Sequence, residues 1–422
     1  MCSPTGEQVQ PHPADNDENE SNAWFPWHLG ACDAHCHPTD TMASIASIAS
    51  MRARMLTIMA TRSEDQDLVS SVAAQHGIKS RADLVEATGH IPCQVVPAYG
   101  WHPWFSHQFY ADTDTAKEST FDPSGEIEAE KTKHYTAVLS STPDAAFIAS
   151  LPNPRPLSQF IAETRERLLA DPTALVGEIG LDKAFRLPQG WDTNEAPKRD
   201  EGLTPGGREG RKLSPHRVKI SHQETVLKAQ LRLAGELGRP VSIHDVGAHG
   251  GLFDVLSSLW KGFEKPVISR RQRRMVAEGA EDFSSDEDLT DDESGKGKKQ
   301  SKAEPYQPRP YPPRICLHSY SGSSETLRQY LDPSIPTQIY FSFSMAVNLS
   351  KDGQWDKFAE VIGACPDNKL LVESDLHVAG GQMDESLAQI YREVCNVKGW
   401  VLTEGMERIR KNYEEYLFGI FD

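Results

Sequence analysis

Apolar residues recur along the chain in eight short runs, several of them continuous rather than alternating with polar residues. Strands of a parallel sheet are buried on both faces, so they carry continuous apolar runs of this kind. The pattern therefore predicts eight buried strands, at residues 31–36, 55–60, 94–99, 174–179, 240–244, 314–318, 339–343 and 370–373.

Helical spacing of apolar residues lies between many of these runs. Such alternation of strand and helix is typical of a barrel or of a doubly wound sheet. Polar side chains at the strand ends, described below, favour the barrel, so the expected fold is a (β/α)8 TIM barrel of the metal-dependent hydrolase type. The predicted helices span residues 157–169, 221–237, 325–331, 355–362, 385–397 and 403–417.

The 422 residues exceed what one barrel needs, because such barrels often use about 250 residues. We expect a disordered tail at 1–25 and one TIM-barrel hydrolase domain at 26–422. Stretches rich in charge, Pro, Gly or Ser cannot bury enough apolar surface to offset the entropy of the chain. They predict disordered insertions at about 111–144, 187–215 and 262–313.

Charge and cysteine content limit the partners and the compartment. The net charge of −17 repels a polyanion on average, so a nucleic-acid partner requires a local basic patch. Seven scattered cysteines indicate a reducing compartment, and Cys32 and Cys36 have no partner pair for zinc, which favours small buried side chains. No apolar run is long enough for a membrane span, and residues 1–22 lack the pattern of a secretory signal. We therefore expect a cytoplasmic or nuclear protein.

The insertion at 262–313 carries basic clusters at 270–274 and 296–299 on either side of an acidic run. The clusters suit a nuclear localisation signal, and Ser284 and Ser285 precede acidic residues as phosphorylated serines often do. A solvated insertion without a specific role explains the same composition.

Candidate chemistry begins with His35 and His37, two positions apart at the end of the first predicted strand. Side chains of a strand alternate between its faces, so both imidazoles point to the same side. At the end of a barrel strand, that side is the mouth of the barrel. An H-x-H pair alone is weak evidence, and its position after an apolar run strengthens it.

Four more polar side chains follow later apolar runs: Glu178 the fourth, His244 the fifth, His318 the sixth and Asp375 the eighth. Barrel enzymes build their active sites at this C-terminal rim. Each residue alone also fits a structural role, whereas the set combines nitrogen and oxygen donors suited to Zn²⁺ or Mn²⁺. Six ligands exceed the three usual for one catalytic zinc, which favours two ions bridged by a carboxylate.

Motifs around these residues resemble those of the TatD-like metal-dependent deoxyribonucleases, a family of the amidohydrolase-type barrel. They occur in the order of the family and leave out the polar insertions. The matching segments are residues 33–37, 99–104, 177–182, 223–244, 316–322 and 371–375.

The resemblance implies two divalent ions (Zn, Mn or Mg) and hydrolysis of phosphodiester bonds at DNA ends. It implies catalytic roles for Glu178, between the ions, and for Asp375, which would orient the attacking water or take its proton. His102 is a candidate for holding a substrate phosphate, although a structural role beside Pro103 and Trp104 is an equal alternative. Ser319 is a second candidate for substrate binding. The implied metal ligands are His35, His37 and Asp375 on one ion, His244 and His318 on the other, and Glu178 on both.

Two departures from the family affect phosphate binding rather than metal binding. Family members usually carry Ser-Pro-Tyr after the last metal-binding aspartate, whereas this chain has Leu376, His377 and Val378. The histidine of the fifth strand is often followed two positions later by arginine, and here that position holds Val246. The insertions and the acidic charge resemble a fungal branch in which members are described as partners of an anaphase-promoting-complex subunit.

Three functions therefore stay open at the level of sequence. The first is a two-metal phosphodiester hydrolase acting on a DNA end. The second is a weakly catalytic or non-catalytic interaction protein that binds a cell-cycle partner, which the complete ligand set disfavours. The third is an amidohydrolase that cleaves C–N or C–O bonds, but such enzymes commonly bridge their metals through a modified lysine where this chain has Glu178.

Overall fold

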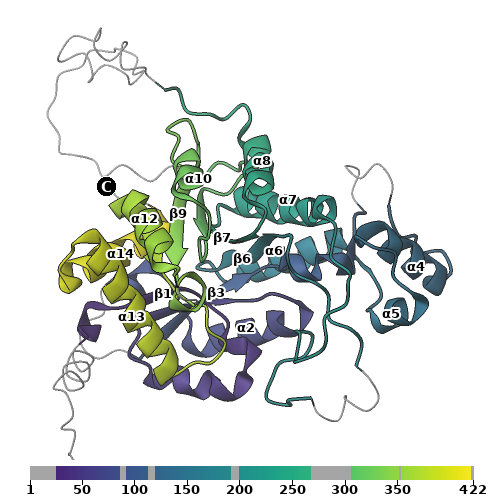
Figure 1. Ribbon diagram of the computed structural model, residues 1–422, viewed down its shortest axis with the longest axis horizontal. Helices are drawn as coiled ribbons and strands as arrows, with labels where there is room; N and C mark the ends of the chain where they lie inside the picture. Colours follow the sequence, from purple (N-terminus) through teal and green to yellow (C-terminus); the bar gives the residue numbers. More distant parts are fainter. Residues whose placement is uncertain are drawn as a thin grey trace, which may run out of the picture.

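The computed structural model describes residues 25–85, 92–112, 119–191, 199–267, 306–350 and 353–419. Within them, eight strands pair in parallel in the order β1-β2-β3-β6-β7-β8-β9-β10 (Figure 1). All eight predicted strands are confirmed, with small differences at their ends. The strands are β1 (Cys32–Cys36), β2 (Met55–Met59), β3 (Gln94–Tyr99), β6 (Leu175–Asp182), β7 (Val241–Val246), β8 (Arg314–Leu317), β9 (Gln338–Phe343) and β10 (Leu370–Val372).

The sheet closes between β1 and the segment that follows β10. The backbone N–H of Asp375 donates to the carbonyl oxygen of His35 at 3.1 Å, and that of His37 donates to Leu376 at 2.9 Å. This nearly closed parallel sheet is the predicted barrel. Because all eight strands run in one direction, their C-terminal ends form a single rim.

Helices surround the strands, and the six predicted ones correspond to α6, α7, α10, α12, α13 and α14 (Figure 1). Among the described residues, no helix combines the length and apolarity needed to cross a membrane. The helices are α2 (Ser63–His76), α3 (Arg81–Val85), α4 (Ile127–Val138), α5 (Ala145–Ser150), α6 (Leu157–Ala170), α7 (Ile220–Leu237), α8 (His249–Trp260), α10 (Ser324–Gln329), α11 (Met345–Asn348), α12 (Trp355–Ala364), α13 (Gly381–Lys398) and α14 (Leu402–Phe418).

Short elements complete the fold. The two-stranded parallel sheet of β4 (Phe109–Tyr110) and β5 (Arg155–Pro156) stands apart from the barrel strands in the pairing order. Cys32 and Cys36 are buried free thiols within β1, which confirms their interpretation as small core side chains. The 3₁₀ helices are η1 (Trp27–Leu29), η2 (Pro38–Asp40), η3 (Met42–Ser50), η4 (Pro103–Gln108) and η7 (Asp367–Lys369).

Helix α7 fixes two of the segments that carry rim residues. Its buried Gln223 accepts from the backbone N–H of Asp182 at 2.8 Å and donates to the carbonyl oxygen of Asp182 at 2.9 Å. Its buried Gln230 makes the same pair of bonds with Trp101, at 2.8 and 3.1 Å. Since both side-chain amides satisfy backbone groups that would otherwise be buried unpaired, they hold the end of β6 and the loop after β3 in place.

Part of the predicted insertion at 111–144 is ordered, so the expectation of disorder is wrong there. Helix α4 begins after Glu126, whose carboxylate accepts from the backbone N–H groups of the first turn. Tyr135 and Val138 on α4 are buried and form a small apolar cluster with residues of α5. The helix went unpredicted because only one narrow stripe of an otherwise polar segment is apolar. Two members of its apolar cluster, Leu187 and Val218, lie far along the chain.

The insertion at 187–215 also departs from the expected disorder in its described part, where Pro188 and Leu213 form an isolated bridge. Residues 199–211 lie against the rim of the barrel, as shown below. The tail at 1–24 and most of the insertion at 262–313, with its basic clusters and Ser284 and Ser285, lie outside the described residues.

Three histidines join the α4 region to η4 and α7. His134 on α4 donates from Nε2 to the carbonyl oxygen of His107 at 2.8 Å and accepts at Nδ1 from Thr120 at 2.8 Å. His107 and His222 each donate to a backbone carbonyl in η4. Burial lowers the pKa of His107 to about 3 and the pKa values of His134 and His222 to about 4. The neutral rings therefore support the loop that carries His102.

We expect the free energy of unfolding to fall as the pH drops from about 6.5 to about 4.5. The unfolded chain takes up protons on these histidines in that range, whereas the folded chain does not, at up to about 1.4 kcal/mol per pH unit for each histidine. The His134→Gln variant keeps a donor to His107 but cannot be protonated. Urea denaturation at several pH values should show a shallower decline for this variant.

The matched control is His28→Gln, because His28 is exposed and distant from the cluster in sequence. This variant should retain the slope of the wild-type protein. Identical slopes for wild type and His134→Gln would contradict the assignment of a neutral, buried imidazole to position 134.

Candidate metal centre

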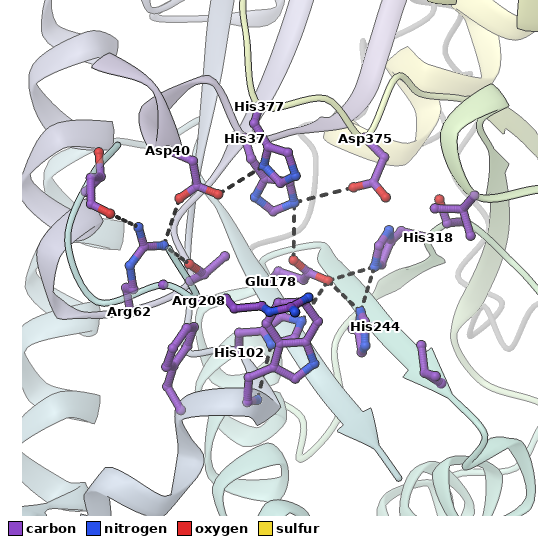
Figure 2. Close-up of a pocket in the computed structure, with 18 of the residues that line it drawn as sticks. His37, Asp40, Arg62, His102, Glu178, Arg208, His244, His318, Asp375 and His377 are labelled. Carbon is purple, nitrogen blue, oxygen red and sulfur yellow. Dashed lines mark hydrogen bonds and ion pairs between the residues drawn. The ribbon is translucent and has the colours of Figure 1, made fainter. Parts of the chain in front are cut away.

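The C-terminal rim of the barrel gathers the six predicted ligand side chains. Five of them line one cavity (Figure 2), and the sixth, His35, is fully buried beside Glu178. The side chains come from five strand ends, so residues far apart in sequence meet there. They are His35 and His37 at the end of β1, Glu178 in β6, His244 in β7, His318 after β8 and Asp375 after β10.

Glu178 lies at the centre of this group and is 3% exposed. Its Oε1 atom is 2.8 Å from Nδ1 of His244, 2.8 Å from Nε2 of His318 and 3.2 Å from Nε2 of His102. His102, predicted only as a substrate-binding residue, therefore lies in direct contact with a predicted ligand. One carboxylate oxygen thus faces three imidazoles.

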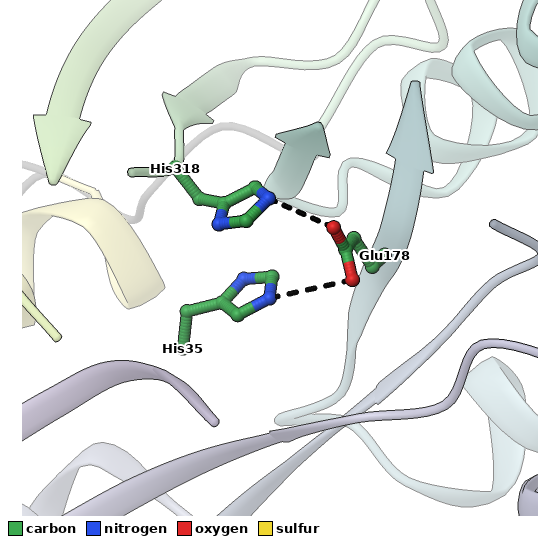
Figure 3. Close-up of side chains that lie close together, drawn as sticks. All are labelled: His35, Glu178 and His318. Carbon is green, nitrogen blue, oxygen red and sulfur yellow. Dashed lines mark ion pairs between the residues drawn. The ribbon is translucent and has the colours of Figure 1, made fainter. Parts of the chain in front are cut away.

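The other carboxylate oxygen, Oε2, faces the pair of histidines at the end of β1. It is 3.5 Å from Nε2 of His35 and 3.4 Å from Nε2 of His37. Asp375 completes this side, with Oδ1 3.5 Å from Nε2 of His37. Figure 3 shows how the two oxygens of Glu178 divide between His35 and His318, whose rings stack at 3.8 Å.

These distances fit divalent cations. Nε2 of His35 and Nε2 of His37 are 3.0 Å apart, so both nitrogens point toward one position. The described residues contain three groups of three side chains that could hold a metal ion, and all three groups include members of this cluster. Within each group, the donor atoms lie within 4.8 Å of one another. Imidazole nitrogen with carboxylate oxygen is a donor set that Zn²⁺ and Mn²⁺ accept. The described residues therefore offer clusters of His, Glu and Asp donors around Glu178 that could hold divalent cations.

The electrostatics of the cluster favour positive charge around Glu178. Burial would raise its pKa, but His102, His318 and His35 together hold that pKa well below its usual range. Burial also opposes a proton on His37, yet the hydrogen bond to Asp375 and the charge of Glu178 outweigh it and raise the pKa of His37 to about 9.

The second side behaves in the same way. Burial disfavours a proton on His244, but hydrogen bonds to Asp182 and Glu178 raise its pKa to about 9. By contrast, burial lowers the pKa of His102 to about 4 and also lowers that of His35. A buried, ionised carboxylate is costly unless positive charge lies beside it. Protons on the neighbouring imidazoles or bound metal ions can supply that charge.

A second layer of side chains orients the imidazoles. Asp182 holds Nε2 of His244 at 3.2 Å and also accepts from the indole of Trp104 at 2.6 Å. The buried carboxylate of Glu373 lies 3.4 Å from Nδ1 of His318. Such outer partners fix the tautomer and the direction of a ligand imidazole.

Sequence reasoning missed Asp182 and Glu373, although a signal for each exists. Asp182 lies four residues after Glu178 on the same strand, which places both on one face. Glu373 lies two residues before Asp375 and continues an apolar run, where an unpaired carboxylate would be costly. The hydroxyl of Ser242, 2.8 Å from Nδ1 of His35, carries no such signal.

Two residues at the rim have unusual backbone conformations. Asp375 has φ of 57° and Ser319 has φ of 39°, in the left-handed region that side chains other than glycine rarely adopt. Ser319 donates its backbone N–H to Glu373 at 2.8 Å, and its hydroxyl donates to the same carboxylate. The predicted substrate-binding role of Ser319 must therefore use a hydroxyl already engaged with Glu373.

Gly180 allows β6 to approach β7 closely at this level. A Cβ atom at this position would lie 1.9 Å from the carbonyl oxygen of His244, which no side chain can accommodate. The close approach sets Glu178 and His244 within hydrogen-bonding distance.

The cavity above the cluster has a volume of about 520 Å³ and is lined by both polar and apolar side chains. Trp104, which stacks on Phe185 at 4.2 Å, forms part of its wall. Asp40 bridges His377 at 3.0 Å and Arg62 at 2.8 Å near the opening. In place of the Ser-Pro-Tyr segment that the family usually has after Asp375, this chain therefore has His377, whose ring is hydrogen-bonded to Asp40 at the rim.

Comparison with known proteins places these residues in a family context. The profile of a family described as "TatD related DNase" matches residues 32–418. The chain is 36% identical to the Cut9-interacting protein scn1 of Schizosaccharomyces pombe over 385 residues, which are 91% of this chain and 98% of that protein. It is 26% identical to an uncharacterized deoxyribonuclease of Saccharomyces cerevisiae over 353 residues, 81% of this chain and 82% of that protein.

Two solved structures align with this chain at low sequence identity. A TatD homolog from Escherichia coli aligns with a TM-score of 0.47 and 16% identity, over 93% of this chain and 99% of that chain. A TatD family hydrolase from Entamoeba histolytica aligns with a TM-score of 0.49 and 10% identity, over the same shares.

Cation binding should release protons from this site. At pH 7 and without a cation, His37 and His244 carry protons because their pKa values are about 9. A metal ion must displace them, so the affinity for Zn²⁺ or Mn²⁺ should increase from pH 6 to pH 9, by up to about tenfold per pH unit for each proton displaced. Isothermal titration calorimetry in two buffers of different ionisation enthalpy counts these protons. An affinity that does not change with pH would rule out these histidines as the groups displaced.

Proposed function

This chain belongs to the TatD family of hydrolases, and we propose that it uses two divalent cations to hydrolyse phosphodiester bonds at DNA ends. The observation that carries the proposal is that the two carboxylate oxygens of Glu178 face two different groups of imidazoles. A carboxylate that could serve two cations suits hydrolysis by a two-metal mechanism.

The proposed ligands follow from that division. His35, His37 and Asp375 would hold one ion, and His244 and His318 the other, with Glu178 on both. His102 lies close enough to Glu178 to contact the second position as well as a substrate phosphate. When bound, the ions supply Lewis acidity to a phosphoryl oxygen and to the attacking water.

Asp375 is the proposed base. Burial would raise its pKa, but the hydrogen bond to His37 and the charges of nearby histidines lower it to about 2, so the carboxylate is ionised at neutral pH. The carboxylate lines the cavity, where it can orient a water and accept a proton as the water oxygen attacks phosphorus and the ester P–O bond breaks. The leaving oxygen then takes up a proton and departs as an alcohol. Trp104 and Phe105 form an apolar wall that limits access of bulk water.

Replacing Glu178 tests the proposed shared ligand, and replacing Asp375 tests the proposed base. Glu178→Ala should lose most bound metal and with it hydrolysis of a single-stranded DNA end. Asp375→Asn should lower kcat by roughly 10²- to 10⁴-fold, while Tm changes little, because asparagine tolerates the positive φ at this position. Metal content by elemental analysis, together with release of nucleotides from a labelled oligonucleotide, measures both effects.

Arg232→Ala on the exposed surface of α7 is the control and should match wild type in metal content and rate. Full activity of Glu178→Ala would contradict the mechanism. Bound metal without hydrolysis of any DNA end in the wild-type protein would contradict the substrate but leave the metal centre intact.

A second candidate function is partner binding, which the 36% identical relative named for its interaction with Cut9 supports. We infer that this chain binds the corresponding cell-cycle protein of its own organism. Glu178 is 3% exposed, so a protein partner cannot contact its side chain directly. Glu178→Ala should therefore retain this binding at wild-type affinity. Co-precipitation with the purified counterpart measures it, and loss of binding in this variant would show that the two functions share one site.

A further inference from the structure

The cavity contains two guanidinium groups among its described lining residues, those of Arg62 and Arg208. The other charged groups near the cation cluster are carboxylates and histidines. An extended phosphodiester substrate carries negative phosphate groups beyond the one that reacts, and these need a partner outside the cluster. The position two residues after His244, where the family often has arginine, holds Val246, so a cation must come from elsewhere.

Arg62 is already used within the protein. Its side chain is 4% exposed and forms ion pairs with Asp40 at 2.8 Å and Asp65 at 3.2 Å. Its remaining donors bind the backbone carbonyl oxygens of Thr204 at 3.1 Å and Pro205 at 2.8 Å. Arg62 therefore fixes structure, because each of its three guanidinium nitrogens already donates within the protein.

Those two carbonyl groups belong to a segment of the insertion, residues 203–209, which we call the wall segment. Thr204 donates its backbone N–H to the carbonyl oxygen of Asp40 at 2.9 Å, and its hydroxyl donates to the carbonyl oxygen of Thr39. With the two bonds from Arg62, these contacts attach the wall segment to the rim beside His37. The wall segment is thus a fixed side of the cavity.

Arg208 extends from the wall segment into the cavity (Figure 2). Its Nε atom donates to the carbonyl oxygen of Arg211 at 3.3 Å, and no described carboxylate lies within ion-pair distance of its guanidinium. The neighbouring Glu209 is instead paired with Arg199 at 2.6 Å. Arg208 is therefore exposed and uncompensated on a side of the cavity whose position is fixed.

The wall segment also limits the size of a substrate. A cavity of about 520 Å³ is in the range of small-molecule sites, roughly 300–1,000 Å³, and is far too small for duplex DNA. Leu203 and Val246 add apolar surface to walls that include Trp104, suited to a sugar or a base. The dimensions fit the last one or two nucleotides of a single strand.

On the basis of the proposed function, we propose that Arg208 binds the phosphate next to the scissile one and so selects short single-stranded ends that carry a terminal phosphate. A guanidinium can bind such a phosphomonoester through two parallel hydrogen bonds. Arg208 then acts as a specificity-determining residue supplied by the insertion rather than by a barrel strand.

The test compares three dinucleotides, TpT, pTpT and TpTp, which share one internucleotide bond and differ in their terminal phosphate. Wild-type protein loaded with Mn²⁺ should cleave one of the two phosphorylated forms with a kcat/KM roughly 10- to 100-fold above that for TpT. Arg208→Gln should abolish this preference and leave the rate on TpT within threefold. Arg208→Lys should retain part of it, and Arg232→Gln all of it.

A binding experiment keeps the test independent of turnover. Thymidine 3′,5′-bisphosphate should bind the metal-loaded wild-type protein more tightly than both thymidine 5′-monophosphate and thymidine 3′-monophosphate, and Arg208→Gln should equalise the affinities. If no dinucleotide is cleaved but this difference persists, the proposed hydrolysis fails and the role of Arg208 stands. Equal losses by Arg208→Gln on all three dinucleotides, or no loss on any, would overturn it.

Discussion

The contact between one buried carboxylate and five imidazoles governs the rim of this barrel. Glu178 is almost fully buried, and an ionised carboxylate in such a place is costly unless positive charge or donors surround it. The strand ends supply them: His35 and His37 face one oxygen, while His102, His244 and His318 face the other. The same arrangement that satisfies Glu178 gathers nitrogen and oxygen donors that could hold divalent cations.

The precision of that arrangement depends on residues that touch no cation position. Asp182 contacts His244, Glu373 contacts His318 and Ser242 contacts His35. In each case the contact uses the ring nitrogen that is not the one nearest Glu178. An imidazole can turn about two side-chain bonds, so its direction at the rim is set by these partners rather than by the strand alone. The barrel brings the ligands to one place, and the second layer aims them.

The insertions contribute to the site as well as to the surface. The α4 region packs a small core of its own and supports the loop of His102 through three neutral histidines. The wall segment, fixed by Arg62, forms one side of the cavity and carries Arg208. A barrel of parallel strands can therefore carry part of its cavity on segments that lie outside its repeating pattern.

Sequence by itself determined the eight strands, six of the helices that surround them and the six candidate ligands. It did so because buried parallel strands carry continuous apolar runs, and because polar residues at the ends of such runs stand out against them. The family resemblance added the division of these residues between two ions.

Only the tertiary structure decided what depends on contacts between distant segments. It placed His102 within the cluster, gave Asp182 and Glu373 their partners, and ordered α4 and the wall segment where composition had predicted disorder. Polar composition measures how little a segment can bury by its own residues. Arg62 and Thr204 show what that measure omits: a polar segment can be held in place by hydrogen bonds to a core built elsewhere in the chain.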